Sequence, residues 1–154
     1  MSDYLLDLGQ NPTARKVVKS LGLPIPIPQT LNRARGPWVA RPLQGRDILV
    51  GTTPGADLDK VLATTLTAAG ANPWVAGDLT AYVGPGEAYG RPPQSVPVDG
   101  GALRPHALVF DATGLTTPAA LRALYDLFQP WVRAVRKSGR FVLIARPADG
   151  ETSP

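Results

Sequence analysis

The stretch that decides the fold is Asp47-Ile48-Leu49-Val50-Gly51-Thr52-Thr53-Pro54-Gly55. Its short apolar run predicts a buried strand, and the Thr, Pro and Gly residues after it predict a tight turn. A helical stretch follows from Asp57, in which apolar residues recur at i, i+3, i+4, i+7 and i+8 until Gly70. Strand, turn and helix in this order indicate the start of an α/β unit.

Three later apolar runs resemble the first and predict further strands; they cover residues 73–76, 107–110 and 140–145. A second amphipathic helix is expected from Pro118 to Val135, with a bend or break near Pro130, which cannot donate to the carbonyl of Asp126. Short apolar strands separated by amphipathic helices indicate a parallel sheet covered on both faces. We therefore expect an α/β fold, a three-layer flavodoxin-like or Rossmann-like domain with about four parallel strands.

The remaining segments set the expected domain organisation. Residues 1–45 hold a helix over 11–21, which Asn11 can cap, and a Pro-rich strap, Leu23-Pro24-Ile25-Pro26-Ile27-Pro28, that should lie extended and bury its isoleucines. The α/β domain is expected over 46–146, and 147–154 should be a frayed end or a linker. Gly and Pro are so frequent over 82–105 that we expect no crossover helix there, or a very short one.

Composition excludes several classes of site. The chain has 154 residues, 44% of them hydrophobic and 18% charged, which is typical of one globular domain. It has no Cys and one His, so thiolate nucleophiles, disulfides and Cys/His zinc sites are excluded and we expect no metal. The first residues lack a basic signal region, and no apolar run reaches the length of a membrane span, so we expect a cytoplasmic protein without membrane or nucleic-acid partners.

The turn after the first strand is the natural place for a phosphate, because backbone N–H groups converge there. Gly51 and Gly55 match the first two glycines of a G-x-x-x-G-x-G loop, but Asp57 stands at the third. The carboxylates of Asp57 and Asp59 are expected to occupy the helix N-terminus as cap and first-turn acid. We therefore favour a structural turn over dinucleotide binding.

The same loop can be compared with the T-x-T-G-x-T loop that wraps a flavin phosphate. Thr52 and Gly55 match it, whereas Pro54 and Asp57 replace two hydroxyl donors. Three aromatic residues could stack on a flavin ring, namely Trp74, Tyr82 and Tyr89. If any cofactor phosphate binds this segment, the candidate residues are Gly51, Thr52, Thr53 and Gly55; otherwise we expect no cofactor here.

Three other polar residues have a structural interpretation that we favour over a catalytic one. Asp78, which could meet a ribose, is expected to be a solvated loop acid. His106 has no evident His, Cys or Ser partner, which favours a structural role. Asp111, with Thr113 and Gly114 beside it, follows a strand where α/β enzymes place chemistry, but capping the next turn is the simpler use.

Several segments of the sequence together resemble a known protein family. The opening Ser2-Asp3-Tyr4-Leu5-Leu6-Asp7, Asn11-Pro12 and Leu21-Gly22-Leu23-Pro24-Ile25-Pro26, followed by an α/β half that ends in Gly139-Arg140-Phe141-Val142, resemble the N-terminal domain of the high-molecular-weight 3-oxoacyl-acyl-carrier-protein reductases. These are two-domain members of the short-chain dehydrogenase/reductase superfamily. Phe110-Asp111-Ala112-Thr113-Gly114 resembles the superfamily's fourth-strand segment.

The resemblance implies a non-catalytic domain. None of the four tyrosines is followed four residues later by Lys, so the superfamily's Tyr-x-x-x-Lys acid is missing and we assign no catalytic residue. The family's NADPH would belong to a reductase domain beyond this segment. We expect this domain to serve docking, assembly or dimer geometry; the alternatives are an autonomous α/β protein that binds a nucleotide or flavin phosphate, and a scaffold whose strap holds a neighbouring domain.

The partners implied are the protein's own reductase domain, a second copy of the chain, and the acidic acyl carrier protein. The net charge of +4 suits an acidic partner. One basic cluster consists of Arg15, Lys16 and Lys19 on the first helix; the partner-binding candidates at the end of the last helix are Arg133, Arg136, Lys137 and Arg140. The alternative use of the second cluster is to stabilise a helix C-terminus.

Overall fold

The computed structural model of the chain describes residues 11–22, 36–97 and 102–147. Its contacts divide the chain into two units, Met1–Gly36 and Pro37–Pro154. In the first unit the expected helix is present as α2 (Pro12–Ser20). Asn11 caps it, since its Oδ1 accepts the N–H of Thr13 at 3.0 Å, and Gly22 follows with a φ of 62°. The strap over 23–28 lies outside the described residues.

The second unit has a sheet of five strands in which every neighbouring pair is parallel. In chain order its elements are β1 (Asp47–Thr52), α3 (Asp59–Ala68), β2 (Asn72–Ala76), α4 (Thr80–Tyr89), β3 (Gln94–Ser95), β4 (Ala107–Asp111), a 3₁₀ turn (Pro118–Ala120), α5 (Leu121–Trp131) and β5 (Arg140–Ile144). Leu43 and Gly45 tie the segment before β1 to the end of α3, because their N–H groups donate to Ala69 O and Gly70 O, each at 3.0 Å. No helix in the described ranges is long and apolar enough to span a membrane.

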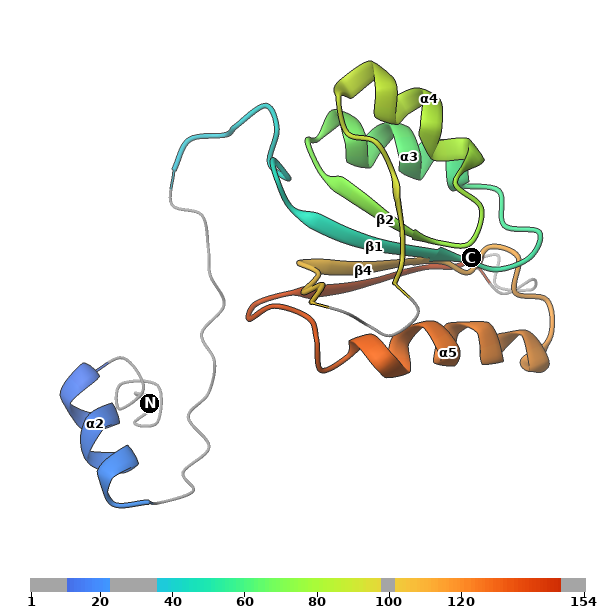
Figure 1. Cartoon of the computed structure of the whole chain (residues 1–154). Helices are drawn as coiled ribbons and strands as arrows, with labels where there is room; N and C mark the ends of the chain where they lie inside the picture. The colour runs from blue at the N-terminus through green and yellow to red at the C-terminus, as the bar shows by residue number, and fades with distance from the viewer. Residues whose placement is uncertain (1–10, 23–35, 98–101, 148–154) are drawn as a thin grey trace, which may run out of the picture. The chain divides into compact units, whose positions relative to one another are not determined.

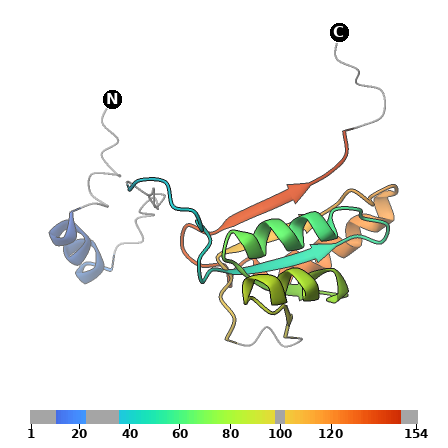
Figure 2. The same ribbon diagram turned by 90° about the horizontal axis from the view of Figure 1, so that it is seen from above.

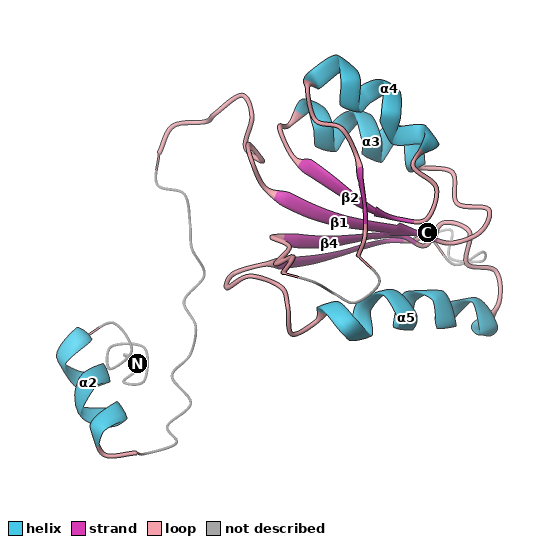
Figure 3. Cartoon of the chain, viewed as in Figure 1, coloured by secondary structure: helices cyan, strands magenta, loops and turns pink. Residues whose placement is uncertain are grey.

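The strand order is β3-β2-β1-β4-β5. This is the order of the Rossmann fold and differs from the 2-1-3-4-5 order of flavodoxin. Helices α3 and α4 cover one face of the sheet and α5 covers the other (Figures 1 and 3). The three-layer α/β architecture expected from the sequence is confirmed, with five strands where about four were expected.

The core consists of two apolar clusters, one on each face of the sheet. Under α3 and α4 the buried side chains are Ile48, Val50, Ala63, Leu66, Ala71, Val75, Tyr82 and Val109. Under α5 they are Leu49, Leu108 and Trp131, with Leu127 and Phe128 packed against them. Successive residues of β1 serve opposite clusters, which is the period-2 alternation of a strand covered on both faces.

The expectation of little or no helix over 82–105 is wrong, because α4 extends from Thr80 to Tyr89 and contains Pro85. The N-cap residue Leu79 has no capping side chain, but Asp78 Oδ1 accepts the N–H of Thr80 in the first turn at 2.8 Å, and Gly90 ends the helix in the left-handed conformation. Tyr82 is 1% exposed between the helix and the sheet. The contacts at the helix ends and burial therefore outweigh the low helix propensity of the Gly-Pro-Gly sequence. The two-residue strand β3 that follows is the fifth strand.

The predicted apolar stripes of α3 and α5 match their buried faces only in part. In α3, Leu66 is buried, but Val61 is 58% exposed and Ala63 is fully buried instead. Helix α5 ends at Trp131, one residue after Pro130, so the predicted break is confirmed. In the second predicted helix, the apolar residues expected to face the sheet included Leu121, Tyr125 and Val132, but these three are more than half exposed, which leaves apolar surface on the outside of α5.

Strand β5 lies at the edge of the sheet next to β4, and Figure 2 shows it apart from α3 and α4. Its sequence, Arg-Phe-Val-Leu-Ile, predicts a strand covered on both faces. The strand is present, but Phe141, Val142 and Leu143 are 50, 39 and 56% exposed. The expectation of a sheet covered on both faces therefore holds for its centre and fails at this edge.

Candidate functional site

The turn between β1 and α3 stands where a Rossmann fold binds a phosphate, at the carboxyl edge of the sheet. Four of its backbone N–H groups already have protein acceptors. Thr53 donates to Asp111 O at 3.0 Å and Ala56 donates to Thr53 O at 3.0 Å. Asp57 donates to Thr113 Oγ1 at 3.2 Å and Leu58 to Asp111 Oδ2 at 2.9 Å. A phosphate would have to displace these acceptors to reach the donors.

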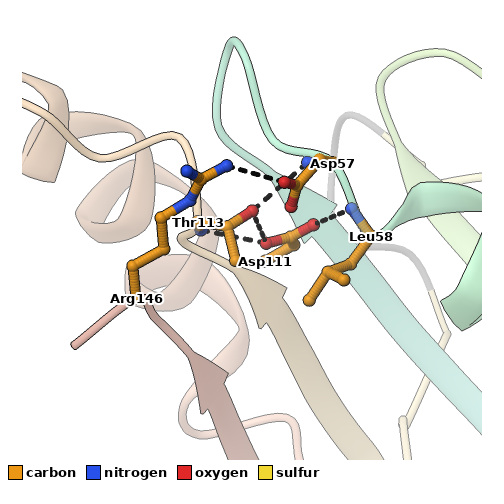
Figure 4. Close-up of polar contacts among 5 residues, drawn as sticks. All are labelled: Asp57, Leu58, Asp111, Thr113 and Arg146. Atoms are coloured by element: carbon orange, nitrogen blue, oxygen red, sulfur yellow. Dashed lines mark hydrogen bonds and ion pairs between the residues drawn. The ribbon is translucent and has the colours of Figure 1, made fainter.

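Asp111, at the end of β4, holds this turn closed (Figure 4). Its carboxylate is fully buried, and its Oδ2 takes the N–H of Leu58 at the start of α3. Its Oδ1 accepts from the backbone N–H and the hydroxyl of Thr113, at 2.9 and 2.6 Å. The expected capping of its own turn is confirmed, and the bond to Leu58 supplies the negative charge that a phosphate would bring to the helix N-terminus.

The expected cap by Asp57 is wrong. The residue before α3 is Leu58, and no side chain caps the helix from that position. The carboxylate of Asp57 turns outward and pairs with Arg146 at 2.6 Å (Figure 4). The turn is therefore filled by a carboxylate from the neighbouring strand, while Asp59 occupies the first helical turn as expected.

Close packing accounts for the glycines around the turn. A Cβ on Gly51 would lie 2.3 Å from Leu127 Cδ2, so this glycine makes room for α5. A Cβ on Gly114 would lie 2.3 Å from Pro54 O and 2.7 Å from Ala56 N, so the loop after β4 presses directly on the turn. Gly55 has a φ of 78°, a conformation that favours glycine. The glycine spacing thus reflects packing and turn geometry.

The two threonine candidates are also engaged in the fold. Thr53 is 3% exposed, and its hydroxyl donates to Asp111 O at 3.1 Å. Thr52 is the last residue of β1 and pairs with Asp111 in the ladder. Of the three aromatic residues, Tyr82 is buried under α4, and Tyr89 lies at the far end of that helix from Asp78. The charges of Asp59 and Asp111 reach the Tyr82 phenol, so of these two tyrosines only Tyr82 lies near the turn.

The carboxyl edge of the sheet is acidic. Burial raises the pKa of Asp59, and the nearby carboxylates of Asp111 and Asp78 raise it further. Burial and the charges of Asp59 and Asp111 also raise the pKa of the Tyr82 phenol. Asp78 is exposed, and its hydrogen bonds from Thr80 lower its pKa. This negative potential disfavours a phosphate. Within the described ranges, no group of three His, Asp or Glu side chains is placed to hold a metal ion.

The opposite, amino edge of the sheet contains His106. Its Nδ1 accepts the N–H of Asp47 at 3.1 Å, which fixes the start of β1 against the start of β4 and confirms a structural role. Burial lowers the pKa of His106, and Arg136 and Arg46 lower it further, against the opposing effect of Asp47. Asp47 Oδ1 in turn accepts from Asn72 Nδ2 at 3.2 Å.

The second basic cluster also lies toward the amino edge, since α5 ends there and β5 begins there. Arg133, Arg136 and Lys137 follow the helix end at Trp131, so they stand outside its last turn, which contains no basic residue. The Arg136 Nε donates to Arg104 O at 2.8 Å, which gives this residue a structural contact. Arg133, Lys137 and Arg140 are exposed. In the first cluster, Lys16 is exposed on α2.

Sequence reasoning located Asp111 but missed its contact with Leu58, and it missed the pairing of Arg146 with Asp57. Both contacts join residues more than fifty positions apart, and no local spacing signals them. Comparison with protein-family models finds no match, and comparison with curated proteins finds none either. The class of protein that the structure defines is a Rossmann-like α/β fold in which the turn after β1 is hydrogen-bonded to Asp111 and Thr113.

Proposed function

We propose that this chain is a non-catalytic Rossmann-like domain that serves docking or assembly. The observation that carries the proposal is the closed turn: Asp111 occupies the N–H of Leu58, and Gly114 lies against Pro54 and Ala56. Together with the resemblance described above, it supports the N-terminal domain of a two-domain, NADPH-dependent 3-oxoacyl-acyl-carrier-protein reductase of fatty-acid synthesis. A cytoplasmic location belongs to the same proposal.

The proposed partner is acidic, and acyl carrier protein is the one that the resemblance implies. Exposed cations collect toward the amino edge (Arg133, Lys137 and Arg140), whereas the carboxyl edge carries Asp57, Asp59, Asp78 and Asp111. An acidic protein is therefore attracted to the amino edge. Such attraction acts mainly on the association rate and weakens as the Debye length falls below about 10 Å.

Ligand titration separates this proposal from the alternative, an autonomous protein that binds a nucleotide or flavin phosphate at Thr52–Gly55. The 154-residue chain is titrated with NADPH and with FMN while the cofactor fluorescence is followed. We expect no saturation and no ketoreductase activity. Saturable binding in the low micromolar range, where working reductases operate, contradicts the closed turn.

Charge reversal tests the docking role. Arg133→Glu with Lys137→Glu should weaken binding of acyl carrier protein at low salt and have little effect at high salt. Arg136 is left unchanged because its guanidinium holds Arg104 O. The matched control is Lys60→Glu, an exposed cation in the first turn of α3, which should leave binding unchanged. Equal affinity of the double variant and the wild type at low salt rules out this surface.

The reading frame around Pro154 tests membership of a two-domain reductase. A continuation that contains T-G-x-x-x-G-I-G and Tyr-x-x-x-Lys supports it, and a stop codon contradicts it.

A further inference from the structure

Strand β5 offers an open edge of apolar character. It pairs with β4 on one side, and no described strand pairs with its other side. Phe141, Val142 and Leu143 are 50, 39 and 56% exposed, and no charged residue interrupts them. Exposed edge strands usually carry a charge, a proline or a cover that prevents pairing with another chain. This strand has none of these between Phe141 and Ile144.

The peptide groups of β5 alternate between β4 and the open edge. Arg140 N–H donates to His106 O, and Ile144 O accepts from Ala112 N–H, so the even-numbered residues of the strand face β4. In a parallel ladder the residues between them turn their N–H and C=O groups the other way. Phe141 and Leu143 therefore present two donors and two acceptors to the open edge.

The open edge is continuous with the exposed apolar side of α5. The rings of Phe141 and Phe128 lie 5.6 Å apart. Phe128 also lines a hollow of about 690 Å³ on α5, together with Leu124, Tyr125, Gln129, Pro130, Val132 and Arg133. The strand edge and the helix side thus form one surface, which we call the β5–α5 surface. Apolar surfaces of this kind are typical of interfaces.

We propose that the β5–α5 surface binds a second copy of this chain. The two β5 strands are antiparallel, and the twofold axis that relates them passes between Val142 of one copy and Val142 of the other. In this register Phe141 lies opposite Leu143 of the other copy, and the outward groups of these two residues form hydrogen-bonded pairs. Both sets of outward donors and acceptors are then satisfied. The five parallel strands of each copy join in one continuous sheet, and the interface is self-complementary as a twofold axis requires.

Charge and side-chain matching select this register. With Val142 opposite Val142, Arg140 faces Ile144 and no like charges meet. A shift that places Val142 opposite Ile144 also sets Arg140 against Arg146, a repulsive pair. The opposite shift sets Leu143 against Gly139 and loses an apolar pair.

Since an axis perpendicular to the sheet keeps both α5 helices on one face, the apolar sides of both helices flank the same joined edge.

A single cysteine tests the register directly, because the natural sequence has none. The Val142 pair is predicted to be of the non-hydrogen-bonded type, with Cα atoms about 4.5 Å apart, which a disulfide can bridge. Two Leu143 residues would be diagonal neighbours about 7–8 Å apart, beyond the usual disulfide range. Under mild oxidation, Val142→Cys should give a covalent dimer of about twice 16.2 kDa.

Two variants serve as controls for the cross-linking rate. Leu143→Cys lies on the same strand, and Val61→Cys lies on α3 with a similar exposure, 58% against 56%. Both should cross-link at least about tenfold more slowly than Val142→Cys, since neither pair meets disulfide geometry in the proposed register. A rate for Leu143→Cys equal to that of Val142→Cys overturns the register.

Light scattering of the full chain tests the dimer itself. We expect the wild type and Val61→Lys to have the mass of a dimer, and Leu143→Lys to fall to 16.2 kDa with an unchanged circular dichroism spectrum. A monomeric wild type, or a dimeric Leu143→Lys, overturns the proposal. If Leu143→Lys fails to fold, the cross-linking comparison still decides. Arg133 and Arg140 belong both to this surface and to the docking site proposed above, but the cross-linking and light-scattering variants change neither residue, so their outcome is separate from that of the carrier-protein test.

Discussion

Replacing Asp111 by Asn should measure how strongly the turn is held closed. In the wild-type protein the N–H of Leu58 donates to Asp111 Oδ2 at 2.9 Å. The amide oxygen of Asn keeps the two bonds from Thr113, but its NH₂ group then faces the N–H of Leu58 and cannot accept from it. A hydrogen bond to a charged group contributes about 1.5–3 kcal/mol, and its loss leaves the Leu58 donor without an acceptor. Removal of a buried charge close to Asp59 offsets part of this loss.

We therefore expect Asp111→Asn to lower the free energy of unfolding by about 2 kcal/mol, or Tm by about 8 °C for a unit of this size. Urea unfolding at pH 7, followed by circular dichroism, gives the value. The control is Asp126→Asn, an exposed acid paired only with Arg122 at i,i+4, which should change stability by less than about 0.5 kcal/mol. If the two variants unfold at the same urea concentration, Asp111 does not lock the turn and the argument for a closed site fails.

Three further predictions concern single residues. Gly114→Ala should lower the free energy of unfolding by about 1–3 kcal/mol, because the added Cβ would lie 2.3 Å from Pro54 O. Gly84→Ala in α4, whose Cβ meets nothing within 4 Å, should raise it by up to about 1 kcal/mol. Equal effects of the two variants in urea unfolding contradict this prediction. Tyr82→Phe should leave thermal stability unchanged or raise it, since the buried hydroxyl has no hydrogen-bond partner, and a clear drop in Tm would show that the hydroxyl stabilises the fold. Burial, Arg136 and Arg46 hold the pKa of His106 below 6.5, so the unfolded chain takes up this proton first and the free energy of unfolding should fall as pH drops from 7 through 6.5 toward the folded-state pKa. His106→Ala should flatten this pH dependence in urea unfolding between pH 7.5 and 5. An unchanged pH dependence assigns it to other groups.

Apolar periodicity was sufficient to predict the central elements of the fold. Strands β1, β2 and β4 are short apolar runs, and each is followed by a turn rich in Gly, Thr or Asp, so their positions could be predicted within one or two residues. Helix α4 could not, because Gly84, Pro85 and Gly86 have low helix propensity. A Cβ on Gly86 would lie 2.8 Å from Arg91 O, so the glycine that argues against a helix is the one that lets the chain fold back on it.

A carboxylate at the start of α3 was predicted from the sequence, but the predicted residue was the wrong one. Asp57 in the third glycine position did indicate that a carboxylate would replace the phosphate, but the carboxylate that does so belongs to Asp111. The bond joins residues 53 positions apart, and it exists because β1 and β4 are neighbours in the sheet. Strand order is set by tertiary packing, which a single sequence reveals only through the class of fold.

The separation of charges along the strands gives the α/β unit an electric dipole moment parallel to the sheet. Asp57, Asp59, Asp78 and Asp111 follow the carboxyl ends of the strands, and Arg46, Arg104, Lys137 and Arg140 stand near their amino ends. A molecule with this arrangement rotates in the field of a charged surface before it touches it. On a negatively charged matrix such as a cation exchanger, the amino ends of the strands would face the support, and the closed turn at the other end would face the solvent. Immobilised in this orientation, the protein would expose the turn to the solvent and cover the start of β5.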